Sequence, residues 1–178
     1  MDTIYYAQIT EENFDAASLD NFVRRQEVAH CWRKRDGQWA LLPIAYVEDW
    51  DPEGRRRRAE RVLRSVQRGD AAYGAWAGET LVGFARLAGP LFGSRKQYID
   101  LAQFHVSAPC RGRGIGRELF RLACRGAREA GAEKLYISAH SAQETMAAYR
   151  ALGCVEAEEI YWPLAKKEPC DVQLEYPL

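Results

Sequence analysis

A strand, a glycine-rich turn and a helix follow one another between residues 97 and 130, and this unit restricts the fold most. The turn reads Val-Ser-Ala-Pro-Cys-Arg-Gly-Arg-Gly-Ile-Gly from Val106 to Gly116. Glycines let the backbone approach an anion closely, and the N–H groups that begin a helix attract negative charge. The side chains of Arg111 and Arg113 add donors for phosphate oxygens. The segment therefore predicts a phosphate-binding turn in an α/β fold.

Hydrophobic spacing and turn residues predict the other elements. An Asp-Gly pair at Asp36 and a Gly-Glu pair at Gly78 lie between strand-like runs, which is typical of hairpins. We expect strands at 4–9, 28–35, 38–46, 71–77, 80–88, 97–106, 134–139, 158–162 and 171–176, and helices at 21–27 (capped by Ser18 or Asp20), 53–68, 114–130 and 141–152 (capped by Ser141). Alternating strands and helices in the second half predict at least one parallel strand pair.

Composition excludes several classes of protein. The 178 residues suit a single domain, and 25 basic residues balance 25 acidic ones, so no global field favours nucleic acid or a membrane surface. We read the run from Arg55 to Arg58, with Arg64, as a solvated helix face in preference to a nucleic-acid site. No apolar run could span a membrane, and no secretory signal begins the chain. Five scattered cysteines without CxxC spacing and three distant histidines predict reduced thiols, no metal site and a cytoplasmic location.

The spacing of the glycines and basic residues in the turn limits the class of phosphate ligand that it could bind. A dinucleotide fingerprint would need glycine at Arg117, and the Gly-Lys-Ser/Thr of a nucleotide-binding P-loop is absent. The pattern Arg-x-x-Gly-x-Gly, formed by Arg111, Gly114 and Gly116, resembles the acyl-CoA pyrophosphate loop of the GNAT acetyltransferase superfamily.

The resemblance extends over residues 71–154. Val106 lies five residues before the loop arginine, as the family's fourth-strand valine does. The stretch from Tyr149 to Gly153 is similar to the second family signature, Tyr-x-x-Leu-Gly-Phe, with Cys154 in place of the aromatic residue. Ala142 stands where the family usually has asparagine.

The resemblance implies a fold, a donor and a reaction. The expected fold is α/β (α+β), a GNAT-like mixed sheet of about six to seven strands with flanking helices, splayed between its fourth and fifth strands. Residues 1–178 would form one domain, with an acceptor-side region and hairpin at 1–70, an acyl-CoA-binding core at 71–154 and C-terminal strands at 155–178. The implied reaction transfers the acetyl group of acetyl-CoA to a primary amine of a small molecule or peptide by direct attack in a ternary complex. The family also allows a homodimer.

The resemblance also assigns roles to individual residues. Tyr149 matches the tyrosine that protonates the departing thiolate, although it shares a helix face with Met146 and Leu152 and core packing is the alternative. The residues expected to bind acetyl-CoA are Phe104, His105 and Val106, through the backbone of the fourth strand, and Arg111, Gly112, Arg113, Gly114, Ile115 and Gly116, in the pyrophosphate loop.

The general base is less determined. Asp100 lies six residues before Val106, where several family members carry a glutamate that deprotonates the amine, often through water. An aspartate would need partial burial to act as a base near neutral pH. We rank Asp100 first and keep His105, His140 and water as alternatives.

Two further hypotheses concern activity and the acceptor. Two departures from the family pattern, Ala142 in place of asparagine and Asp100 in place of glutamate, allow an alternative function. The protein would then be a GNAT-like module that binds or senses CoA with little or no turnover. The aromatic residues of the first half would form a lid over the acceptor site, with ordinary packing as the alternative, and nearby acidic residues would attract a cationic amine. The aromatic residues are Trp32, Trp39, Tyr46 and Trp50, and the acidic ones are Glu48, Asp49 and Asp51.

Overall fold

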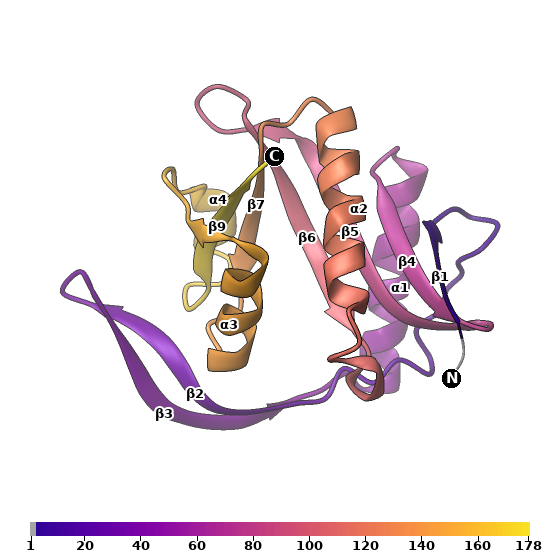
Figure 1. The fold of residues 1–178 in the computed structure, drawn as a ribbon, viewed down its shortest axis with the longest axis horizontal. Helices are drawn as coiled ribbons and strands as arrows, with labels where there is room; N and C mark the ends of the chain where they lie inside the picture. Colours follow the sequence, from indigo (N-terminus) through magenta and orange to yellow (C-terminus); the bar gives the residue numbers. More distant parts are fainter. Residues whose placement is uncertain (1–2) are drawn as a thin grey trace.

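Seven strands form a central mixed sheet in the computed structural model, which describes residues 3–178 (Figure 1). Among the strands of residues 3–178 in this sheet, only β6 and β7 pair in parallel, and the other pairs are antiparallel. Along the sheet the strands are β1 (Ile4–Gln8), β4 (Ala72–Ala77), β5 (Thr80–Phe92), β6 (Tyr98–Val106), β7 (Lys134–Ala139), β9 (Val172–Pro177) and β8 (Val155–Glu156). The expected mixed sheet of six to seven strands with flanking helices is confirmed.

Helices cover both faces of the sheet. α2 (Ile115–Glu129) and α3 (Gln143–Leu152) lie on one face, and α1 (Pro52–Gln67) lies on the other (Figure 1). Leu119 and Ala123 lie on the apolar face that the sequence predicts for α2, and both are fully buried against the sheet. A short helix, α4 (Trp162–Ala165), precedes β9. Within residues 3–178 no helix combines the length and apolar character that a membrane span requires.

The parallel pair β6–β7 separates after three residue pairs. Tyr98, Ile99 and Asp100 face β7 in register, and Asp100 opposite Tyr136 is the last pair. On its other side β6 carries a bulge, because Leu101 and Gln103 oppose the adjacent residues Leu87 and Arg86 of β5, and Ala102 is the extra residue. Counted along the sheet, β6 and β7 are the fourth and fifth strands, so the expected splay is present.

A separate two-stranded hairpin crosses beneath the sheet (Figure 1). It consists of β2 (Gln26–Arg35) and β3 (Gln38–Glu48), joined by Asp36 and Gly37, which both have positive φ (49° and 78°) as the Asp-Gly signal predicts. The backbone N–H of Trp32 donates to the carbonyl of Ser141 at 2.8 Å, and Cys31 forms a β-bridge with Ala142. The hairpin is thereby attached to the segment between β7 and α3.

Three local predictions are wrong. Residues 21–27 form no helix, because their backbone groups bond to other segments: the N–H of Val23 donates to Ser107 Oγ at 3.0 Å, and its carbonyl accepts from the N–H of Ala108 at 2.8 Å. Residues 158–162 form no strand; β8 ends at Glu156, and Pro163, which has no N–H to donate in a sheet, stands in the first turn of α4.

The predicted cap of α3 is wrong as well. Ala142 is the N-cap residue of α3. The hydroxyl of Ser141 instead accepts a hydrogen bond from Arg33 Nη1 at 2.6 Å. The serine is used to hold the hairpin, so it is not available to the helix.

Candidate active site

The divergence of β6 and β7 opens a cleft of about 860 Å³. Its walls come from the end of β6, the end of β7, one face of α3, the root of the hairpin and the turn that precedes β9. The lining residues are Val23, Arg24, Arg25, Gln26, Glu27, Glu48, Leu101, Ala102, Gln103, Phe104, His105, Val106, Ala108, Arg111, Ser138, His140, Glu144, Thr145, Ala148, Tyr149, Glu168 and Asp171. The cleft thus includes Phe104, His105, Val106 and Tyr149, which the sequence proposed for the site.

The glycine-rich turn presents open backbone at the start of α2. Gly112 and Gly114 have φ of 74° and 81°, and a Cβ at either position would meet no atom within 4 Å. No side chain caps the N-terminus of α2, which begins at Ile115. At Gly116 a Cβ would lie 3.6 Å from Phe104 and 3.7 Å from Val106, which is ordinary van der Waals contact, so this part of α2 packs against β6. The turn has the free N–H groups and the space that a pyrophosphate requires.

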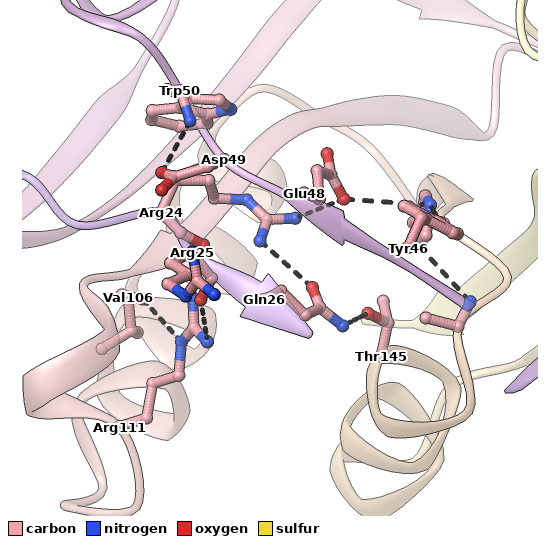
Figure 2. Close-up of polar contacts among 12 residues, drawn as sticks. Arg24, Arg25, Gln26, Tyr46, Glu48, Asp49, Trp50, Val106, Arg111 and Thr145 are labelled. Atoms are coloured by element: carbon pink, nitrogen blue, oxygen red, sulfur yellow. Dashed lines mark hydrogen bonds and ion pairs between the residues drawn. The ribbon is translucent and has the colours of Figure 1, made fainter. Parts of the chain in front are cut away.

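The Arg111 side chain is exposed, and its guanidinium is hydrogen-bonded to three backbone carbonyls. Its Nε donates to the carbonyl of Val106 at 3.1 Å, and its Nη1 and Nη2 donate to the carbonyls of Arg25 and Arg24 at 3.0 and 2.9 Å (Figure 2). This guanidinium therefore joins the end of β6 to the root of the hairpin. The sequence predicted a phosphate ligand here and did not indicate this structural role.

The opposite end of the hairpin root is attached to α3. Gln26 Nε2 donates to Thr145 Oγ1 at 3.1 Å, and Gln26 Oε1 accepts from Arg24 Nη1 at 3.1 Å (Figure 2). Together with Arg111, these contacts carry the hairpin root across the cleft from the glycine-rich turn to α3. The root is therefore a fixed wall of the site.

Tyr149 projects from α3 into the cleft. The side chain is buried, and burial raises the pKa of the phenol above its ordinary value of 10.0. Its ring lies 6.0 Å from the ring of Phe104. Within residues 3–178 the hydroxyl has no hydrogen-bond partner, so its proton is available to a ligand in the cleft.

The proposed bases occupy different environments. Asp100 lies at the vertex of the splay, and burial raises the pKa of its carboxyl to about 7, but the cleft lining begins one residue later at Leu101. The centroid of the His105 ring lies 4.9 Å from that of Trp50 and 5.4 Å from that of Phe84. Burial, together with nearby arginines, lowers the pKa of His105 to about 3. His105 is therefore a neutral, packed ring that resists protonation.

His140 lines the cleft and contacts the hairpin. Its Nε2 hydrogen-bonds to the hydroxyl of Tyr46 and lies 3.8 Å from Glu48 Oε2, and its Nδ1 accepts from the N–H of Ala142 at 3.3 Å. Both ring nitrogens are thus engaged with the protein. This arrangement connects the end of β7 with β3.

Asp171 is a carboxylate in the cleft that the sequence analysis missed. Its Oδ2 accepts from Ser138 Oγ at 3.0 Å, and Ser138 Oγ in turn accepts from Gln173 Nε2 at 3.0 Å. Gln173 Oε1 accepts from the hydroxyl of the fully buried Tyr136 at 2.8 Å. Burial raises the pKa of the Asp171 carboxyl. The only sequence signal was its place at the start of a predicted strand, which does not distinguish it from other polar residues.

The charges of the cleft are separated. Arg24, Arg25 and Arg111 lie at the end near the glycine-rich turn, whereas Glu144, Glu168 and Asp171 lie at the end formed by α3 and the turn before β9. These three acidic residues form no ion pair with any residue in 3–178. At the end near the glycine-rich turn, Glu48 and Glu27 pair with Arg24 and Arg25, and Arg111 has no carboxylate partner in residues 3–178. The cleft therefore has one unpaired positive charge near the turn and three unpaired carboxylates at its other end.

The aromatic residues proposed as a lid have separate places. Trp50 is a core residue that stacks on Phe22 at 5.7 Å, and Tyr46 meets His140 at the cleft. Trp32 and Trp39 lie farther along the hairpin and line a second cavity. The structure does not bring the four together over one site.

The acidic residues of the first half are also divided. Glu48 lines the cleft and pairs with Arg24 at 3.1 Å. Asp51 instead caps α1 by accepting from the N–H of Gly54, and Asp49 accepts from the N–H of Trp50 at 2.7 Å. In the described part of the chain, residues 3–178, no three His, Cys, Asp or Glu side chains gather as a metal site would require.

Comparison with known proteins agrees with this geometry. The family model described as the acetyltransferase (GNAT) family matches residues 32–154. The chain belongs to the GNAT acetyltransferase family. No curated protein matches its sequence significantly.

Solved structures of GNAT acetyltransferases share the fold over nearly the whole chain. Nourseothricin acetyltransferase superimposes with a TM-score of 0.72 at 16% identity, covering 98% of both chains. A putative streptothricin acetyltransferase from Bacillus anthracis, in complex with acetyl coenzyme A, gives 0.67 at 12% identity, covering 99% of this chain and 97% of the other. The PaiA N-acetyltransferase from Thermoplasma acidophilum, in complex with coenzyme A, gives 0.64 at 16% identity, covering 99% of both.

Two departures from the GNAT signatures have structural counterparts. Ala142, in place of the usual asparagine, is fully buried and pairs with Cys31 of the hairpin. Cys154, in place of the aromatic residue, is buried in the core cluster that contains Tyr149. In this GNAT domain both positions therefore serve packing.

Proposed function

We propose that the protein transfers the acetyl group of acetyl-CoA to a primary amine of a cationic small molecule, in a ternary complex. The observation that carries this proposal is the unpartnered hydroxyl of Tyr149 in a cleft with a basic end and an acidic end. Family membership and neighbours solved with CoA or acetyl-CoA support the donor. The acidic end supports an acceptor that arrives with positive charge.

The donor would lie along the glycine-rich turn and the end of β6. The N–H groups from Gly112 to Gly116 would hold the pyrophosphate, with Arg113 nearby. The backbone of Phe104 to Val106 would hold the pantetheine arm and the thioester carbonyl. This arrangement leads the thioester into the gap between β6 and β7, next to Tyr149.

The reaction then needs proton transfer at two places, the amine and the departing thiolate. The amine lone pair attacks the thioester carbonyl carbon, the carbon–sulfur bond breaks, and the departing thiolate takes the proton of the Tyr149 hydroxyl. Because burial raises the pKa of Tyr149, the phenol stays protonated at working pH and can donate. Because the acceptor binds as an ammonium, a carboxylate first takes one of its protons and passes it to solvent, which frees the lone pair for attack. The nitrogen loses a second proton to the same carboxylate after the attack, and solvent reprotonates the tyrosinate.

For this carboxylate we favour Asp171 over Asp100. Asp171 lines the cleft, and the hydrogen bond from Ser138 to its Oδ2 leaves Oδ1 for the ammonium of the acceptor. Asp100 has a carboxyl pKa near 7, suited to a base, but it would need water to reach the cleft. Asp100 therefore stays the alternative base.

A direct test begins with calorimetric titration of the protein with acetyl-CoA, with NADH and ATP as controls. We expect selective binding of acetyl-CoA, followed by amine-dependent release of free CoA thiol with a panel of primary amines. Binding without thiol release for any amine would support the alternative, a GNAT-like CoA-binding module. No binding would refute the donor assignment.

The free cysteines of the chain fit a cytoplasmic enzyme.

A further inference from the structure

A second cavity, of about 340 Å³, lies between the hairpin and the C-terminal segment of the chain. Its apolar lining comes from Trp32 and Trp39 of the hairpin and from Ile160, Pro169 and Val172 on the other side. None of these residues takes part in the acetyl transfer derived above. The cavity is at the lower end of the size range of small-molecule sites and suits one ring system.

This second cavity adjoins the active-site cleft. A single turn, closed by the hydrogen bond from the N–H of Asp171 to the carbonyl of Glu168 at 3.0 Å, separates the two. Glu168 lines the cleft, Pro169 and Cys170 line the second cavity, and Asp171 lines both. A molecule that lies across this turn would reach Tyr149 with one end and Trp39 with the other.

The charged groups at the outer part of the second cavity already make polar contacts within the protein, although Arg33 has no carboxylate partner in residues 3–178. Trp39 Nε1 donates to Glu156 Oε1, and Lys34 Nζ lies 3.4 Å from the same oxygen. Arg33 Nη1 donates to Ser141 Oγ at 2.6 Å and to the carbonyl of Trp32 at 2.8 Å. Only Asp171, at the inner end, has no cationic partner in residues 3–178. The cavity therefore offers tryptophan and aliphatic surface to a flat apolar group, and a carboxylate where it meets the cleft.

We propose that the second cavity binds the apolar tail of the acceptor, so that the substrate is an amphipathic primary amine. The flat tail packs against Trp39 and Ile160, and the amine crosses the 168–171 turn to Asp171 and the thioester. This proposal rests on the proposed function and specifies the substrate class of the same site.

The test is a series of amines in the thiol-release assay with saturating acetyl-CoA. Phenylalkylamines with one to five methylene groups are compared with ethylamine, and the readout is the ratio of kcat/KM for each phenylalkylamine to that for ethylamine. We expect the ratio to reach about ten or more at one linker length, because filling an apolar pocket discriminates at that level. Ratios near one at every length would overturn the proposal.

Variants locate the effect. Trp39→Ala and Ile160→Lys should each lower the highest ratio of kcat/KM values about ten-fold. Ile160 is 38% exposed and lies on a segment outside helices and strands, so the Ile160→Lys variant is expected to fold. Trp162→Ala is the control, since Trp162 is 61% exposed and outside the cavity lining, and its ratio should stay unchanged. An unchanged ratio in Ile160→Lys, or an equal loss in Trp162→Ala, would overturn the proposal.

The assay also separates this proposal from the proposed function. If kcat/KM for ethylamine equals that for the phenylalkylamines, the second cavity does not bind the acceptor tail, and the proposed N-acetyltransferase function still stands. Failure of every amine, with acetyl-CoA bound, refutes the proposed function and the tail site with it.

Discussion

Replacing Tyr149 with phenylalanine should separate catalysis from stability. In residues 3–178 the Tyr149 hydroxyl makes no hydrogen bond, so its removal should change the free energy of unfolding by less than about 0.5 kcal/mol. The same hydroxyl is the proposed proton donor, and losing general acid catalysis should lower kcat about 100-fold, or about 2.7 kcal/mol of activation free energy. The affinity for acetyl-CoA should be unchanged.

Tyr98 provides a matched control for this variant. Its hydroxyl donates to the buried carboxylate of Glu175, and neither residue lines the cleft. Tyr98→Phe should therefore cost about 2 kcal/mol of stability, as expected for a hydrogen bond to a charged group, and leave kcat of the folded protein unchanged.

Thermal or urea unfolding and the thiol-release assay measure both quantities. If Tyr149→Phe is destabilised like Tyr98→Phe while its kcat is kept, then Tyr149 is a core tyrosine and another group supplies the proton. The assignment of the acid would then be wrong.

Substitutions at four other positions test the rest of the site. Asp171→Asn should lower kcat/KM about 100-fold and remove the acidic limb of its pH profile, while Asp100→Asn keeps that limb; the reverse result would make Asp100 the base. Because burial raises the pKa of Asp171, its ionised form costs folding free energy, so the stability of the Asn variant relative to the parent should rise with pH, as unfolding curves at pH 4 to 8 would show. Gly114→Asp should abolish acetyl-CoA binding in calorimetry, and an affinity equal to that of the parent protein would refute the pyrophosphate assignment. Gly114→Ala should cost about 1 kcal/mol of stability, because residue 114 has a positive φ, and should weaken binding less than Gly114→Asp does. Arg111→Lys should cost about 2 kcal/mol and increase amide hydrogen exchange in residues 23–27, and unchanged exchange would refute its role in holding the hairpin root.

The sequence was most informative where local patterns determine backbone conformation. The Asp36-Gly37 turn, the helix that buries Leu119 and Ala123, and the strand 134–139 have strong local signals, and the structure confirms all three. The expected helix at 21–27 failed because the preference of a short segment was weaker than its hydrogen bonds with Ser107, Ala108 and Arg111. Such long-range partners leave no local pattern.

The residues of the candidate site also differ in whether a local sequence pattern could identify them. Phe104 to Val106, the glycine turn and Tyr149 belong to contiguous motifs, so the resemblance identified them together. Asp171 became a candidate only when the sheet placed β9 beside β7 and brought Ser138 to its carboxylate. Its role depends on residues 33 positions apart, and no spacing within one element could reveal it.

The separated charges of the cleft also bear on how a turnover would end. Acetylation converts an ammonium into a neutral amide, so the attraction of Glu144, Glu168 and Asp171 acts on the substrate and not on the product. The acidic end would therefore release the amide soon after it forms, and free CoA, retained by the glycine turn, would leave last. Inhibition by accumulated CoA should accordingly be strong, and inhibition by the acetylated amine weak.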